Sequence, residues 1–407
     1  MNMDEHGEYG EFPLPGEDRP YVEPLQDSPH FIVTFDAVVE EKSLSYEEAC
    51  RCLGLLGKDE SGVRYAYLSI KAVDRKLTEV STILNFKHVL FLDLSGNLLN
   101  LEALQVLAQM PFLLWLTANR NRVESGALQE MPYLQVLCLS ANKIEETCDI
   151  AQPMLEKLEL EYNQIFTVQF AGDKLPNLKT LDLKGNHLMD LSGTYPKSLE
   201  HLYLAKNKIT KLQDLALTPN FSNLTVLFLR DNKIRKLNGF TKYLTKLTYL
   251  NLRGNSITKM RQFRKLDCLP NLETLIYTEN PVDKKKGEER RGEDDDEDLE
   301  EEFGEDGPIK KQDPWDPVRI GVLVLLPKLK RINKIPVSLE ERDEAVFIKD
   351  IKITQIMLED SSDEETEPPT TTTYSSEADV TETELGQSSV FDPRKDETTD
   401  EEDEEEI

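Results

Sequence analysis

The sequence is poor in the residues on which many enzymes and secreted proteins depend. It contains only five cysteines and five histidines in 407 residues. No two cysteines form a CxxC pair, and an odd number does not suit a disulfide framework, so free thiols in a reducing compartment are expected. No HExxH, GxSxG or GxxxxGK[ST] motif occurs. We therefore expect no metal site, no cofactor and no catalysis.

Long apolar runs are also missing. No segment approaches the roughly 18–20 apolar residues that span a bilayer. The first twenty residues have neither a basic start nor an apolar core, so no signal peptide is expected. These observations favour a location in the cytoplasm.

Positive charge is scarce, with 48 basic against 77 acidic residues and a net charge of −29. Residues 1–280 contribute 31 − 36 = −5, and residues 281–407 contribute 17 − 41 = −24. A general nucleic-acid binder needs a basic footprint, and an anionic membrane surface repels acidic segments. We expect no nucleic-acid, membrane or small-molecule partner.

The most prominent feature that the sequence does contain is a repeated pattern, LxxLxLxxNxL. Its asparagine occurs at nine positions: Asn97, Asn121, Asn142, Asn163, Asn186, Asn207, Asn232, Asn255 and Asn280. Successive asparagines lie 21 to 25 residues apart, which is the period of leucine-rich repeats. The pattern predicts an α/β solenoid: a leucine-rich repeat horseshoe of about nine short repeats, with parallel strands on its concave face.

The residue types of the repeat have physical reasons. Leucines at the inner strand positions point into the solenoid, and stacked strands lie about 4.8 Å apart. The asparagine side chain has two donors and an acceptor, so we expect it to bind backbone groups of its own turn and of the next coil. Repeats this short leave room only for single helical or 3₁₀ turns on the convex side.

The chain divides into six predicted segments. We predict a disordered N-terminal arm at 1–40, an N-terminal cap with a degenerate first repeat at 45–85, the repeat array at 86–282, an acidic disordered insert at 283–312, a C-terminal cap at 313–340 and an acidic disordered tail at 341–407.

Details within the caps and the arm refine this division. Residues 45–57, SYEEACRCLGLLG, predict a short amphipathic helix with Ala49, Leu53, Leu55 and Leu56 on its apolar side. The apolar run 320–326 is expected to be buried in the C-terminal cap. The acidic, Pro-rich arm contains one apolar island, HFIVTF, at residues 30–35.

A protein-binding surface is predicted on the concave face. Strand side chains alternate, so residues two, four and six before each asparagine should face outward there. An acidic middle, with Glu159, Glu161 and Asp182, separates two aromatic regions. Exposed aromatic and arginine side chains are typical of binding hot spots. The candidates are Phe91, Trp115, Tyr203, Phe228, Arg230, Tyr249, Arg253 and Ile276.

Two readings of this surface stay open. In the first, the candidate side chains bind a partner. Phe228 and Tyr249 then face solvent, and truncating them leaves the fold stable. The other has the chain's own tails cover some of them, or has them tolerated singly at the surface.

Particular stretches carry a closer resemblance. They are EEACRCLGLLGKDESGVRYAYLSIKAVDRKLTEV, FLLWLTANRNRV, ALQEMPYLQVLCLSANKI, TYLNLRGNSI and the closing ENP. Together they resemble the family of leucine-rich repeat-containing protein 23. The resemblance runs from about Ser45 to Pro281 and resumes at LLPKLKRINK.

This resemblance implies a role in the radial spokes of motile cilia and flagella. The implied function is that of a non-catalytic adaptor in the axoneme, a cytoskeletal structure, which binds other axonemal or radial spoke proteins and supports spoke assembly and sperm motility. Two alternatives remain: a regulatory subunit of a protein phosphatase, and an acidic leucine-rich histone-binding protein of the nucleus. The run KKKGEERR is a poor nuclear import signal for the latter.

Overall fold

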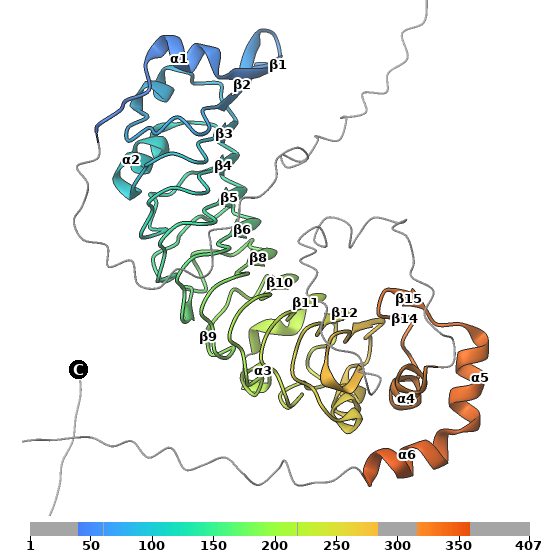
Figure 1. Ribbon diagram of the computed structural model, residues 1–407. Coiled ribbons are helices and arrows are strands. Elements are labelled where there is room, and N and C mark those ends of the chain that lie inside the picture. Colours follow the sequence, from blue (N-terminus) through green and yellow to red (C-terminus); the bar gives the residue numbers. More distant parts are fainter. Residues whose placement is uncertain (1–39, 60, 218, 284–315, 359–407) are drawn as a thin grey trace, which may run out of the picture. The chain divides into compact units, whose positions relative to one another are not determined.

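A computed structural model describes residues 40–59, 61–217, 219–283 and 316–358. Almost all of the arm and of the insert predicted to be disordered, and most of the predicted tail, lie outside these residues. The described residues belong to one unit of the chain. Within it, coils stack on one another, with short strands along one side and helical turns along the other (Figure 1).

Nine parallel strands, each of three residues, form the repeating part of the sheet. They are β3 (Phe91–Asp93), β4 (Trp115–Thr117), β5 (Val136–Cys138), β6 (Lys157–Glu159), β8 (Thr180–Asp182), β10 (His201–Tyr203), β11 (Val226–Phe228), β12 (Tyr249–Asn251) and β13 (Thr274–Ile276). Consecutive strands pair one repeat apart, with Leu92 opposite Leu116. The prediction of a leucine-rich solenoid with about nine repeats is confirmed.

The core is built from one leucine at the centre of every strand. Each of these nine leucines is at most 1% exposed. Burying one leucine side chain contributes on the order of 2 kcal/mol, so the stacked leucines supply much of the driving force for folding. The first and third residues of each strand point to the opposite side of the sheet.

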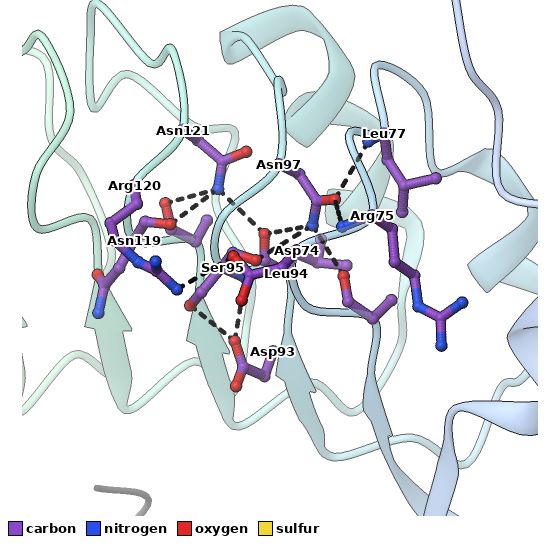
Figure 2. A network of polar contacts seen from close by, with 12 residues as sticks. Asp74, Arg75, Leu77, Asp93, Leu94, Ser95, Asn97, Asn119, Arg120 and Asn121 are labelled. Atoms are coloured by element: carbon purple, nitrogen blue, oxygen red, sulfur yellow. Dashed lines mark hydrogen bonds and ion pairs between the residues drawn. The ribbon is translucent and has the colours of Figure 1, made fainter. Parts of the chain in front are cut away.

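The nine repeat asparagines form a ladder on the side where the strands end, and none is more than 9% exposed. Figure 2 shows two of its members. The Oδ1 of Asn97 accepts from the backbone N–H groups of Arg75 and Leu77, and its Nδ2 donates to the carbonyls of Ala72 and Leu94. The side chain thus bonds to its own turn and to the preceding coil. The sequence predicts bonds to the following coil, and this prediction is wrong, because the bonds run to the preceding coil.

The residue before each of these asparagines adopts the left-handed conformation, with φ between 51° and 70°. Glycine occupies only three of the nine positions, Gly96, Gly185 and Gly254. The other six are Arg120, Ala141, Tyr162, Lys206, Asp231 and Glu279. Left-handed backbone costs a non-glycine residue about 1 kcal/mol. The asparagine hydrogen bonds that follow each turn offset this cost.

The opposite side of the coils holds short helical elements and one small sheet. These elements are η1 (Ser81–Asn85), α2 (Leu101–Gln105), η2 (Val106–Gln109), α3 (Asp214–Leu217), η3 (Pro219–Asn223), η4 (Met260–Cys268) and η5 (Pro281–Asp283), with a parallel pair formed by β7 (Val168–Gln169) and β9 (Gly193–Thr194). Among the described residues, no helix has both the length and the apolarity that crossing a membrane requires.

The N-terminal end is closed by a helix and a hairpin. Helix α1 (Tyr46–Arg51) begins with a capping box between Ser45 and Glu48. Strand β1 (Leu53–Lys58) then pairs antiparallel with β2 (Tyr65–Lys71), which continues the parallel sheet into β3. The prediction of one helix over 45–57 is wrong, because Leu53–Gly57 joins the sheet instead. Leu55 and Leu56 are consequently exposed.

A second hairpin and three helices close the C-terminal end. Helix α4 (Pro317–Leu325) is almost entirely buried, and β14 (Arg331–Ile332) adds to β13 before turning into β15 (Ile335–Pro336). Helices α5 (Leu339–Phe347) and α6 (Lys349–Met357) follow. The predicted disorder of the tail is therefore wrong for residues 341–358. A capping box starts α5, and Ala345 and Ile356 are buried against the rest of the unit.

Candidate functional site

The surface made by the first and third side chains of the nine strands, extended by the hairpin β1–β2, is called the strand face below. Six of the predicted site residues lie within strands, and Arg230 and Arg253 lie two residues after the ends of β11 and β12. The parallel register places Tyr203 beside Phe228, and Phe228 beside Asn251. Register alone fixes which side chains are neighbours, but it does not fix how far each is exposed.

An aromatic cluster, made of Tyr203, Phe228 and Tyr249, spans β10, β11 and β12. The ring centroids of Tyr203 and Phe228 lie 4.7 Å apart with an interplanar angle of 22°. Those of Phe228 and Tyr249 lie 5.1 Å apart at 32°. Offset aromatic pairs at these distances stabilise one another beyond their buried area. The three rings therefore pack as one continuous cluster across the three strands.

Two of the predicted site residues are covered. Phe228 and Ile276 are each only 2% exposed, although both belong to strands of this face. For Phe228, the two tyrosine rings pack on either side and supply part of the cover. The prediction that Phe228 faces solvent is wrong. The surface that a partner can reach is instead provided by Tyr203 and Tyr249, which are half-buried.

The two arginines of the site are already ion-paired. The Nε of Arg230 lies 3.1 Å from Oδ2 of Asp231, its neighbour in the chain. Arg253 contacts Oε1 of Glu279 through Nη2 at 2.7 Å and through Nε at 3.0 Å. About four fifths of both arginine side chains is shielded from solvent, with 17% and 20% exposed. Each guanidinium group is thus paired with a neighbouring carboxylate, which offsets its charge.

The middle of the strand face is acidic and partly buried. Glu159 lies opposite Asp182 in the sheet and pairs with Lys157, whose Nζ is 2.7 Å from its Oε1. Burial raises the pKa of Asp182 well above its ordinary value, and the neighbouring Glu161 raises it further. Burial likewise raises the pKa of Glu161. In the strand order, this region lies between the strands that carry the two aromatic regions.

The pKa values of Cys138 and His201, two further residues of this face, are also shifted. Burial raises the pKa of the Cys138 thiol, and Glu159 adds to the effect. Burial lowers the pKa of His201, whose Nδ1 lies 3.3 Å from the Thr180 hydroxyl oxygen. In the strand order, β6 and β8 lie between Cys138 on β5 and His201 on β10, so the thiol and the imidazole are not neighbours.

The N-terminal part of the strand face is larger than predicted. Phe91 and Trp115 lie opposite each other and are half-buried, and the Trp115 Nε1 donates to the Thr117 hydroxyl at 3.0 Å. The hairpin adds Tyr65 and Tyr67, which are 70% and 50% exposed. These tyrosines are not among the residues predicted from the sequence, although their period-two spacing in YAYLSIK indicates a shared face.

The chemistry available on the strand face is that of a binding surface. Within the described part of the chain, no three His, Cys, Asp or Glu side chains gather as metal ligands. The strand face offers tyrosine edges, ion-paired guanidinium groups and half-buried carboxylates. Such groups form directional contacts with another polypeptide.

A family model described as Leucine rich repeat matches residues 197–257, and a second, Leucine Rich Repeat, matches residues 177–202. The crystal structure of an internalin from Listeria monocytogenes aligns with 67% of this chain and 84% of its own, at 18% identity and a TM-score of 0.39. The chain contains leucine-rich repeats.

Two relatives share more of the sequence. The chain is 35% identical over 230 residues to leucine-rich repeat-containing protein 23 of Bos taurus, and 33% identical over 253 residues to that of Homo sapiens. Each match covers 56% of this chain and 66% of the relative, slightly less than two thirds of the relative's length.

Proposed function

We propose, from the premise that this chain belongs to the family of leucine-rich repeat-containing protein 23, that it is a non-catalytic adaptor of the ciliary or flagellar axoneme. Its partners are other axonemal or radial spoke proteins, and it supports radial spoke assembly and flagellar motility. The family resemblance supports the location in the axoneme. The strand face supports the binding role.

The observation that carries the proposal is the aromatic cluster of Tyr203, Phe228 and Tyr249. Phe228 is held between the two tyrosine rings, so the rings lose little further freedom when a partner binds. Arg230 and Arg253 lie at adjacent strand ends and add charge-assisted hydrogen bonding at the border. A preorganised aromatic centre with an arginine border has the composition of a protein-binding hot spot.

The test uses the two tyrosines rather than Phe228, because Phe228 is buried. A variant with Tyr203→Ala and Tyr249→Ala is compared with wild type for recovery with salt-washed axonemes. The matched control is Tyr243→Ala, since Tyr243 is 70% exposed and lies outside the strands. Binding of the double variant should fall by about 2–4 kcal/mol, while the control binds like wild type. Thermal melts establish that both variants are folded.

The outcomes separate the parts of the proposal. If the folded double variant sediments with axonemes as well as wild type, the aromatic cluster is not the binding site. If wild type itself does not associate with axonemes, the ciliary role is wrong. Co-purification of wild type with a phosphatase catalytic subunit would then favour the regulatory alternative.

A further inference from the structure

Helices α5 and α6 lie on the outer side of the C-terminal end, beyond α4 (Figure 1). On α5, Glu341 and Ala345 are buried and lie four residues apart, so they share the face that packs on the rest of the unit. On α6, Ile356 is buried in the same way. Each helix therefore has a second face that is turned away from the solenoid.

The outward faces of both helices are apolar, where a surface helix is usually polar. The large apolar side chains on them are 68% to 85% exposed: Leu339, Val346, Phe347, Ile351 and Leu358. Leu339 and Val346 lie seven residues apart, as do Ile351 and Leu358, so each pair lies about two helical turns apart on one face. Single exposed apolar residues are ordinary, but a cluster of them marks an interaction site.

Two basic side chains of these helices are turned toward the solenoid. The Nη1 and Nη2 of Arg342 donate to the carbonyls of Pro327 and Leu329, both at 2.7 Å. Lys352 lies against α4, with its Cε close to Gly321. Their positive charges are therefore drawn away from the outward faces.

The charge that remains on the outer side is mainly negative. Three acidic side chains there are exposed, against one basic side chain, Lys349. The acidic residues are Glu340, Asp343 and Asp350. The sequence that follows Leu358, EDSSDEETE, adds six acidic residues and no basic one. A ligand that covers the apolar side chains must therefore carry positive charge at its border.

We propose that the outward faces of α5 and α6 bind an amphipathic helix of a partner protein, whose apolar stripe is bordered by lysine and arginine. A helix suits this site because its own side chains recur at the same spacing of three, four and seven residues. Its apolar stripe covers Phe347 and Ile351, and its basic side chains meet Asp343 and Asp350. This site lies apart from the strand face, so it goes beyond the proposed function and does not depend on it.

Model peptides test the chemistry of the partner. Fluorescence anisotropy at about 0.15 M salt measures binding of the full chain to labelled peptides of about 18 residues, long enough to form a helix. The first is a Leu/Lys amphipathic helix, the second has the same composition without an apolar stripe, and the third is a Leu/Glu amphipathic helix. The first should bind about tenfold more tightly than either of the others.

Each other outcome of this comparison overturns the proposal. Equal binding of the first two peptides would show that charge alone attracts them. Equal binding of the first and third would show that the acidic border does not select the partner. No binding of the Leu/Lys helix, as would follow if the chain's own residues covered the face, would overturn it directly.

A double substitution locates the site without changing any charge. Phe347→Ser with Ile351→Ser should weaken binding of the Leu/Lys helix about tenfold or more. The matched control is Met189→Ser with Tyr243→Ser, since these side chains are also exposed but belong to the repeat array. Thermal melts of both variants should match wild type, because all four side chains are at the surface. Equal affinities of the two variants would contradict the proposal.

Sedimentation over a range of protein concentrations tests a second copy as the occupant. We expect a monomer at every concentration. A dimer that dissociates in the Phe347→Ser, Ile351→Ser variant, but not in the control variant, would assign the face to a second copy and overturn the proposal.

Discussion

The guanidinium of Arg319 and the carboxylate of Glu341 form an ion pair with almost no solvent contact at the C-terminal end of the array. Nε lies 2.5 Å from Oε1, and the two side chains are 2% and 6% exposed. Arg319 also donates to the carbonyls of Ile332 and Pro336. One buried side chain thereby connects α4, the hairpin β14–β15 and α5.

Breaking this pair from one side should destabilise the protein strongly. Glu341→Ala leaves a buried guanidinium without its counterion, and a loss of about 3–5 kcal/mol in the free energy of unfolding is expected. Urea denaturation provides the measurement. The control is Glu340→Ala, at an exposed neighbouring position, which should change stability by no more than about 0.5 kcal/mol. Similar midpoints for the two variants would contradict the assignment.

The same pair predicts a pH dependence. Burial opposes ionisation of Glu341, but the hydrogen bonds from Arg319 and Ser338 outweigh it and hold the pKa of Glu341 below its usual 4.5. A carboxyl whose folded pKa is depressed contributes stability above its unfolded pKa, and the contribution is lost as pH falls through the folded pKa.

Stability should therefore decline below about pH 4.5, and Glu341→Gln should make this decline shallower. Denaturation midpoints between pH 3 and pH 7 measure the effect, with Glu340→Gln as the control. An identical acid decline in wild type and Glu341→Gln would show that this group does not contribute to it.

A substitution within the asparagine ladder has a defined cost. The Oδ1 of Asn186 accepts from the Ile165 N–H at 3.1 Å, and its Nδ2 donates to the Leu160 and Leu183 carbonyls. Asn186→Leu leaves these groups unpaired and should lower stability by about 1–3 kcal/mol. Gln164→Leu, at an exposed amide side chain, is the control. Equal thermal melts for wild type and Asn186→Leu would refute the ladder at that position.

Phe228 should behave as a core residue. Phe228→Ala removes a ring that packs between Tyr203 and Tyr249, and a loss of about 3 kcal/mol is expected by comparison with other buried phenylalanines. Tyr243→Ala, at an exposed ring, should change the melting temperature little. If Phe228→Ala were as stable as wild type, the ring would contribute to the surface rather than to packing.

Much of the solenoid could be predicted from its sequence because one residue repeats. The asparagine spacing locates each turn, and the leucines before it locate each strand. The nine strands therefore lie where the pattern places them. Few residue types suit each position of the repeat, because every repeat requires a short strand, a left-handed turn and a buried asparagine amide.

Elements outside the repeat were harder to predict. The run Leu53–Gly57 is too short for its apolar residues to distinguish a helix from a strand. Residues 341–358 contain enough charge to predict disorder, but Ala345 and Ile356 find buried positions that only the folded array provides. Alternation placed Phe228 on the correct face, but it could not reveal that neighbouring rings cover it.

The direction of the asparagine ladder has a consequence for synthesis on the ribosome. Each asparagine accepts from a backbone N–H of the coil made before it, as Asn121 does from Leu99. A newly made turn must therefore wait for the next 21 to 25 residues before its N–H finds this acceptor. At about 5–20 residues per second, the delay is about 1–5 s for every coil. The newest turn of the growing chain is therefore the one whose N–H still lacks this acceptor.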